Sequence, residues 1–181
     1  NNIIYFDHNA TYPALPSVAE AVADLQNLPL NPSSLHKYGR DAKSLIESAR
    51  SKISNFANGK NYNLIFTGSG TEANNLALRG VNLPVVTTLG EHASVLQPVG
   101  KGIVAVDQNG IVDLEMLEHI LQTLDKKLLV SVILANNETG VIQPIAKIAE
   151  LVHKYDCLLH TDASQALGKI PLDLEDLKAD L

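Results

Sequence analysis

The sequence has 181 residues, of which 45% are hydrophobic and 19% charged, and its formal net charge is −6. This charge, with no basic cluster, argues against a nucleic-acid partner, because binding to phosphate backbones depends on neutralisation by Lys and Arg. No apolar run approaches the roughly 20 residues of a membrane-spanning helix, and the N-terminus lacks the pattern of a signal peptide. We therefore expect a soluble, cytoplasmic, globular protein with neither a nucleic-acid nor a membrane partner.

The single cysteine, Cys157, allows no internal disulfide and no cysteine-based metal cage, and we predict no metal site. It stands at the start of an expected strand. A reactive thiolate needs exposure and cationic surroundings, which the neighbouring residues do not indicate. We expect Cys157 to be a small core residue.

Residues 1–60 are predicted to form an N-terminal segment with helices. A short helix follows Pro16, and a longer one covers residues 40–57, where apolar side chains recur at steps of three and four. Asn58 and Gly59 are typical of a helix C-cap. We expect both apolar faces to point inward: Val18, Ala21, Val22 and Leu25 in the first helix, and Ala42, Leu45, Ile46, Ala49, Ile53, Phe56 and Ala57 in the second.

Residues 61–181 repeat a strand, a turn and a helix. Strands are expected at 64–67, 85–88, 103–106, 128–134 and 157–162. Helices are expected after the glycine turn at 68–70, near Glu91, after Asp113 and from Pro144. Their inward faces would include Ala73, Leu76, Ala77 and Gly80, then Leu114, Leu117, Leu121 and Leu124, then Ile145, Ile148, Ala149 and Val152. Apolar strands alternating with helices predict an α/β fold with a mostly parallel sheet and helices on both faces.

Four polar loops follow the expected strands, at residues 67–71, 91–92, 136–138 and 162–165. In an open α/β sheet, ligands gather beyond the carboxyl ends of the strands. The glycine-containing loop at 67–71 is either a phosphate cradle at a helix N-terminus or a purely structural turn. It has neither the Walker A lysine nor the spacing of the dinucleotide fingerprint.

The other loops also allow two interpretations. His92 either begins a helix or stacks its imidazole on a planar ring. Asn137 either bonds to its own turn or donates to a ring oxygen. Asp162 directly follows an apolar strand and needs a cationic or N–H partner, and Gln165 can share its pocket. A heteroaromatic ring with a phosphate, an oxygen and a protonated nitrogen would satisfy all four loops, and pyridoxal phosphate has these features.

Six motifs, in order, resemble those of the cysteine desulfurases of the NifS/IscS type. These belong to the class V aminotransferases, which are fold type I pyridoxal-phosphate enzymes. The motifs lie at residues 5–11, 31–36, 70–75, 91–92, 136–140 and 160–165. The Asn-Pro-Ser-Ser-Leu-His segment at 31–36 favours the desulfurase branch. By this resemblance, residues 61–181 are a partial large domain of a pyridoxal-phosphate-dependent transferase.

The resemblance implies six cofactor-binding positions: Gly70, Thr71, His92, Asn137, Asp162 and Gln165. The glycine and the threonine would hold the phosphate, and the aspartate would pair with the pyridinium nitrogen. The histidine would stack on the ring and be the catalytic acid and base. The asparagine and the glutamine would bond to the ring oxygen. One departure affects this set, because residues 67–70 read Thr-Gly-Ser-Gly where the family usually has serine before glycine.

The family reaction converts L-cysteine to L-alanine and leaves a persulfide on an enzyme cysteine. The sulfur then passes to an acceptor or scaffold protein for iron–sulfur cluster or thio-cofactor assembly. Family members are homodimers. Other class V activities, such as that of selenocysteine lyase or of a small-amino-acid aminotransferase, remain alternatives, and so does a non-catalytic cofactor-binding or interaction fragment.

The Schiff-base lysine and the persulfide cysteine of the family belong to a region beyond Leu181. We therefore expect this chain to correspond to the N-terminal half of a cysteine desulfurase and to be inactive by itself. Absence of later strands would leave a sheet edge and apolar helix faces uncovered. We expect the chain to form a homodimer or to be complemented by a C-terminal half.

Overall fold

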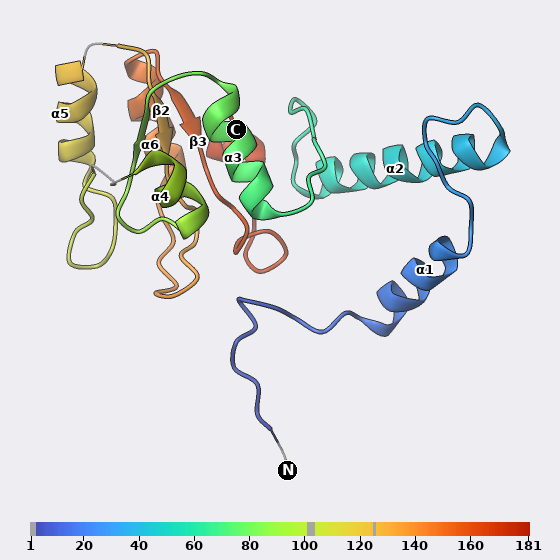
Figure 1. Ribbon diagram of the computed structural model, residues 1–181. Helices are drawn as coiled ribbons and strands as arrows, with labels where there is room; N and C mark the ends of the chain where they lie inside the picture. The colour runs from blue at the N-terminus through green and yellow to red at the C-terminus, as the bar shows by residue number, and fades with distance from the viewer. Residues whose placement is uncertain (1–2, 101–103, 125) are drawn as a thin grey trace. The chain divides into compact units, whose positions relative to one another are not determined.

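The computed structural model describes residues 3–100, 104–124 and 126–181. It contains two compact units, Asn1–Phe56 and Ala57–Leu181, and each is described by itself (Figure 1). In the described residues, no helix has the length and the apolar character that crossing a membrane requires.

The first unit contains the two predicted helices, α1 (Pro16–Gln26) and α2 (Lys37–Phe56). Proline begins α1, a position where its missing N–H removes no helical hydrogen bond. Shortly after α2, Asn58 has a φ of 49°, the left-handed conformation that ends many helices. The helical positions and the role of Asn58 therefore follow the sequence pattern.

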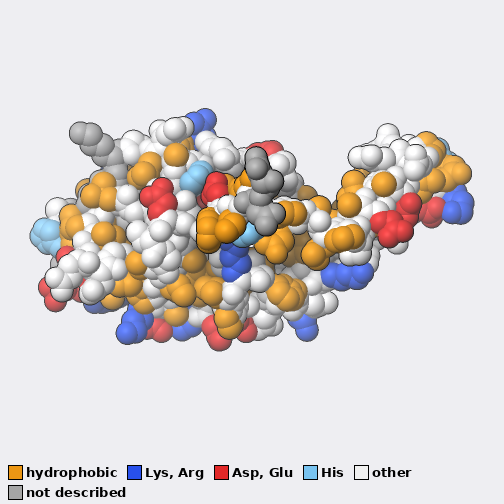
Figure 2. All heavy atoms as spheres, turned by 90° about the horizontal axis from the view of Figure 1, so that it is seen from below, with side chains coloured by type: hydrophobic (Ala, Val, Ile, Leu, Met, Phe, Trp, Pro, Cys, Tyr) orange, Lys and Arg blue, Asp and Glu red, His pale blue; other side chains and the backbone are white. Residues whose placement is uncertain are grey.

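The burial predicted for these two helices is wrong. In α1 no residue is buried, and α2 buries only Gly39 and Ala42. Of the side chains expected to point inward, only Ala42 and Ala57 are buried, and Phe56 is 68% exposed. The described residues of this unit include no sheet on which the apolar stripes could pack. Apolar side chains are visible at many places on the face shown in Figure 2.

The second unit is built on a three-stranded parallel sheet in the order β1-β2-β3. The strands are β1 (Val85–Thr87), β2 (Leu129–Ser131) and β3 (Leu158–His160). Val86 pairs with Val130, which pairs with Leu159, and this register aligns the carboxyl ends of the strands. The unit also contains α3 (Gly70–Gly80), α4 (Ala93–Val99), α5 (Leu114–Leu124), α6 (Ile145–Lys154) and α7 (Leu174–Leu177).

Helices cover both faces of this sheet, which confirms the predicted α/β class (Figure 1). On one face, Val86, Val130 and Leu159 pack in a core with residues of α5 and α6. All four inward residues predicted for α6 are buried, and Cys157 lies in the same core. On the other face, Leu129 packs with Leu78 of α3 and Val95 of α4. Successive strand residues thus point to opposite faces, as the pleat requires.

Two predicted strands differ in the structure. Residues 64–67 lie outside the sheet, and the side chain of Ile65 is 67% exposed, so this segment lacks the burial that supports a strand. Of the strand predicted at 103–106, residue 103 lies outside the described residues. Val104 and Val106 form only isolated bridges, with Thr88 and Val112 respectively. The other three strands are confirmed, although they are shorter than predicted.

The buried face of α3 also differs from the prediction. The expected inward residues were Ala73, Leu76, Ala77 and Gly80, whereas the structure buries Asn74 and Leu78. Leu78 packs towards α4, and Asn74 has buried polar partners. The predicted face instead lines an open hollow of about 500 Å³, together with Ile65 and Leu181.

Candidate functional site

Asp162 lies just beyond the carboxyl end of β3, and its side chain is buried. Its Oδ2 accepts a hydrogen bond of 2.8 Å from Asn74 Nδ2, and its Oδ1 accepts one of 2.9 Å from the backbone N–H of Ser164. Burial alone would raise the pKa of this carboxyl. Hydrogen bonds from Ser164 and Asn74, with the nearby His160, outweigh burial and lower the pKa below its usual value. Asp162 is therefore a carboxylate at neutral pH.

The hydrogen bonds to Asp162 come from the amide of Asn74 and from the backbone N–H and side chain of Ser164, which are neutral groups. They solvate the negative charge but do not neutralise it. An opposite charge close to a buried carboxylate also favours its charged form. The chemistry of these donors thus fits a ligand that brings a cationic atom, such as a protonated ring nitrogen.

The loop at 67–71 forms a closed turn before α3. Ser69 is the N-cap and accepts a hydrogen bond from the backbone N–H of Glu72, while Glu72 Oε2 accepts one of 2.7 Å from the N–H of Gly68. This reciprocal pair resembles a capping box. Gly70 and Thr71 occupy the first positions of the helix, where a backbone N–H has no partner within the helix. The serine that departs from the family pattern therefore caps α3, and its side chain does not use the N–H groups of Gly70 and Thr71.

Gly70 brings this loop against the loop that follows β3. A Cβ atom at position 70 would lie 3.3 Å from Ser164 Oγ, closer than most real contacts of this kind. Glycine therefore permits the approach. As a result, the N-terminus of α3 and Asp162 belong to one site.

His92 is the N-cap of α4, and its Nδ1 accepts a hydrogen bond of 3.1 Å from the backbone N–H of Ser94. The same Nδ1 lies 2.8 Å from Ser94 Oγ. Asn74 Nδ2 donates to Ser94 Oγ at 2.9 Å as well as to Asp162. The structure therefore links His92 to Asp162 through two buried polar side chains.

Asn137 and Gln165 are half-buried in the loops after β2 and β3. The turn-stabilising role considered for Asn137 is performed by its neighbour Asn136, whose Oδ1 accepts from the N–H groups of Glu138 and Thr139. Asn136 Nδ2 also donates to the carbonyl of Gly90 at 2.8 Å, which joins the loops after β1 and β2. Gln165 accepts a hydrogen bond from Lys169 Nζ. Among the candidate residues, direct links through shared partners thus join Gly70, His92 and Asp162, whereas Asn137 and Gln165 lie on the adjoining loops.

Sequence reasoning missed a second buried carboxyl group, that of Glu91. Its Oε1 accepts hydrogen bonds from the N–H of Ile133, at 2.6 Å, and from Thr88 Oγ1, at 3.1 Å. Its Oε2 is buried without a partner in the part of the chain that the structure describes. Burial raises the pKa of Glu91 to about 8, and the nearby Asp162 adds to this increase. Glu91 is therefore mostly neutral at pH 7 and holds the loop after β1 against the end of β2.

His160 was also missed as part of the site. It is buried in β3, with Nδ1 2.9 Å from Ser131 Oγ, and burial lowers its pKa although Asp162 opposes this. The imidazole is therefore neutral at pH 7. A histidine inside an apolar strand, two residues before an aspartate, is the sequence signal that indicates this pair.

The fold is a parallel α/β domain with a cluster of buried polar side chains at the carboxyl ends of its strands. A sequence profile of the Aminotransferase class-V family matches residues 4–181. The chain belongs to the class V aminotransferase family, as its motifs predicted.

Several similar proteins are named cysteine desulfurase or NifS-like. Cysteine desulfurase IscS of Dictyoglomus turgidum is 37% identical over 194 residues, which cover 98% of this chain and 49% of the relative. The X-ray structure of a NifS-like protein from Rickettsia africae matches with a TM-score of 0.94 and 39% identity, covering 99% of this chain and 52% of that one. The structure of SspA in complex with cysteine matches with a TM-score of 0.85 and 27% identity, covering 97% and 55%. The chain spans about half the length of the curated relatives it matches.

Replacement of the buried carboxyl in Glu91→Gln should change how stability depends on pH. The folded state raises this pKa from 4.5 to about 8, so the wild type binds the proton more tightly when folded. Its stabilising effect is complete below pH 4.5 and is lost as the pH rises towards 8. Between pH 5 and 8, the free energy of unfolding of the wild type should fall relative to that of the variant, by on the order of 3 kcal/mol.

Urea denaturation of both proteins at the two pH values measures this difference. Comparison at the same pH cancels the contribution of His160, which is present in both proteins. Parallel pH profiles for the two proteins would show that Glu91 is already ionised at pH 7.

Proposed function

We propose that this chain is the cofactor-binding half of a cysteine desulfurase that uses pyridoxal phosphate. The observation that carries the proposal is the buried, ionised Asp162, whose hydrogen-bond donors are neutral and which lies beside the N-terminus of α3. A cationic heterocycle with an attached anion matches this pairing of a negative carboxylate with free N–H groups. Membership of the class V family agrees with it.

Each candidate residue would have a separate role toward the cofactor. Asp162 would keep the ring nitrogen protonated, and the N–H groups of Gly70 and Thr71 would bind the phosphate. His92 would lie against the ring, and Asn137 with Gln165 would donate to its oxygen. When bound, pyridoxal phosphate supplies an electron-withdrawing ring that stabilises negative charge on the substrate.

The substrate that we propose for the complete enzyme is L-cysteine, with a sulfur-acceptor or iron–sulfur scaffold protein as the partner. The names of the relatives, and the complex of SspA with cysteine, support a cysteine substrate. In this chain the sole cysteine, Cys157, is 3% exposed, and burial makes it a poor sulfur carrier. The persulfide would therefore form on a residue of the half that the relatives have in addition.

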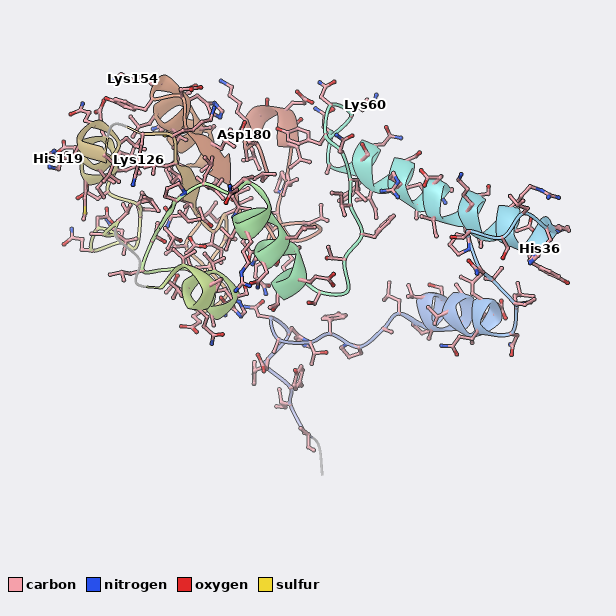
Figure 3. All side chains as sticks on the ribbon, turned by 45° about the horizontal axis from the view of Figure 1, so that its top comes forward. His36, Lys60, His119, Lys126, Lys154 and Asp180 are labelled. Atoms are coloured by element: carbon pink, nitrogen blue, oxygen red, sulfur yellow. The ribbon has the colours of Figure 1, made fainter. Side chains whose placement is uncertain are left out.

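The edge of β3 supports completion of the sheet by further polypeptide. Leu181 donates its N–H to Leu159 and accepts from the N–H of Thr161, at 3.2 and 3.0 Å, which is the pattern of a parallel bridge. Asp180 is labelled in Figure 3, and its Oδ2 accepts from the N–H of Leu159 at 2.8 Å. One part of the hollow, beside Leu181 and α3, is lined by apolar side chains such as Leu76, which is 50% exposed. Another part is lined by Gly70 and Asp162 of the candidate site. We propose that a parallel strand of the second half fills the apolar part of this hollow.

The role of Asp162 is tested by titrating the purified 181-residue chain with pyridoxal phosphate in equilibrium dialysis. Asp162→Asn should weaken binding by about tenfold or more, because an amide cannot stabilise a cationic ring nitrogen. Asp156→Asn is the matched control, since the side chain of Asp156 is 93% exposed and binding should not change. Equal affinities of all three proteins would contradict the proposal.

The isolated chain should form no alanine from L-cysteine even when pyridoxal phosphate is present, because the proposed sulfur carrier lies in the other half. Amino-acid analysis after incubation measures this, and an intact homologous desulfurase serves as the positive control. Formation of alanine at a rate proportional to the concentration of the chain would contradict it.

The uncovered hollow should make the isolated chain self-associate. Leu76→Arg places a charge in the hollow and should shift sedimentation towards the monomer, because the apolar contact is lost. Leu124→Arg is the control, since Leu124 is 40% exposed on α5 and does not line the hollow. A wild type that stays monomeric at all concentrations, or an equal effect of both variants, would exclude the hollow as the associating surface.

A further inference from the structure

We propose that Asn74 is a positioning residue, whose single amide group orients the Asp162 carboxylate and, through Ser94, fixes the tautomer of His92. This inference deepens the proposed function, on which the cofactor roles of Asp162 and His92 rest. Asn74 has no assigned role toward the cofactor, and its position between α3 and α4 carries the inference.

Both N–H bonds of the Asn74 amide are used. Nδ2 donates to Asp162 Oδ2 at 2.8 Å and to Ser94 Oγ at 2.9 Å, and the side chains of Asn74 and Ser94 are 5% and 6% exposed. A carboxylate only accepts hydrogen bonds, so the amide nitrogen and not the oxygen must face Asp162. The chemistry of the partner therefore fixes the orientation of this amide.

The orientation of the Asn74 amide also determines where the Ser94 hydroxyl donates its hydrogen bond, and His92 is the acceptor. Because Ser94 Oγ accepts from Asn74, its own hydrogen is directed to another acceptor, and His92 Nδ1 lies 2.8 Å away. The backbone N–H of Ser94 also donates to Nδ1, at 3.1 Å. An imidazole nitrogen that accepts hydrogen bonds carries no proton of its own, so the neutral ring carries its proton on Nε2.

A fixed tautomer has a chemical consequence. Protonation of Nδ1 would break two hydrogen bonds, whereas Nε2 has neither of these partners. The neutral ring therefore presents Nε2–H as a hydrogen-bond donor, and the lone pair of Nδ1 is used within the protein. If His92 meets a bound substrate or cofactor through Nε2, the neutral ring donates a hydrogen bond there and takes up no proton at that atom.

Charged groups near Asp162 do not set the orientation of its carboxylate. The ionisable side chains that influence it are His160 and Glu91, and burial favours the neutral form of each. Asn74 and Ser164, the latter through its backbone N–H and its side chain, are thus the groups that set the direction of the carboxylate. Of these two donors, only Asn74 also reaches Ser94.

The experiment is NMR on the labelled 181-residue chain, in which ¹⁵N shifts report the His92 tautomer and ¹³C titration reports the pKa of Asp162. Asn74→Ala should raise the pKa of Asp162 by about one pH unit, because a donor to the charged form is removed. It should also populate the Nδ1–H tautomer of His92. Ser94→Ala should raise the fraction of the Nδ1–H tautomer of His92, because only the backbone N–H of residue 94 then donates to Nδ1, and should leave the pKa of Asp162 near its wild-type value.

Asn75→Ala is the matched control, because the amide of the adjacent Asn75 donates only to the Thr71 carbonyl of its own helix. Both readouts should stay at their wild-type values in this variant. If Asn74→Ala does not fold, Ser94→Ala still tests the tautomer, and a wild-type tautomer in that variant would overturn the proposal. Wild-type values of both readouts in folded Asn74→Ala would overturn it as well.

These measurements are made without cofactor, so their outcome is separate from that of the proposed function. A changed tautomer and a raised pKa in Asn74→Ala support the inference even if Asp162→Asn binds pyridoxal phosphate as well as the wild type does. Conversely, weak binding by Asp162→Asn together with unchanged readouts in Asn74→Ala would keep the proposed function and reject the role of Asn74.

Discussion

The arrangement of polar groups at the carboxyl end of the sheet depends on the burial of one negative charge, that of Asp162. Removing a carboxylate from solvent is expensive unless hydrogen bonds or opposite charge replace the lost hydration. At Asp162 the replacement comes from the amide of Asn74 and from the backbone N–H and side chain of Ser164, while His160 and Glu91 are held in their neutral forms by burial. One carboxylate therefore dominates the local electrostatics, and the other polar groups are arranged around it.

Periodic apolar residues predicted most of the second unit because periodicity reports burial directly. The strands β1, β2 and β3 and the inward face of α6 followed from it, and strand topology then placed the polar loops at one edge. Asn74 could not be predicted in this way. A polar residue within a helix is expected to be exposed to solvent. In addition, the partners of Asn74, Ser94 and Asp162, lie 20 and 88 residues away in the sequence.

The errors at residues 64–67, α1 and α2 have a different origin. A local pattern shows that a face is apolar, but it does not show what covers that face. Side chains such as Ile65 and Phe56 are largely exposed, because the described residues of each unit provide no surface that encloses them. The chain matches about half the length of its curated relatives, so partner surfaces can lie outside the sequence from which the prediction was made.

The amide of Asn136 donates to the carbonyl of Gly90, and Glu91 accepts from the N–H of Ile133. These hydrogen bonds hold the loops after β1 and β2 in one arrangement in the absence of a ligand. A preorganised receptor loses little conformational entropy on binding, so more of the contact energy appears as affinity. Removing one of these hydrogen bonds would increase the conformational entropy that is lost on ligand binding, although every side chain that contacts the ligand would remain.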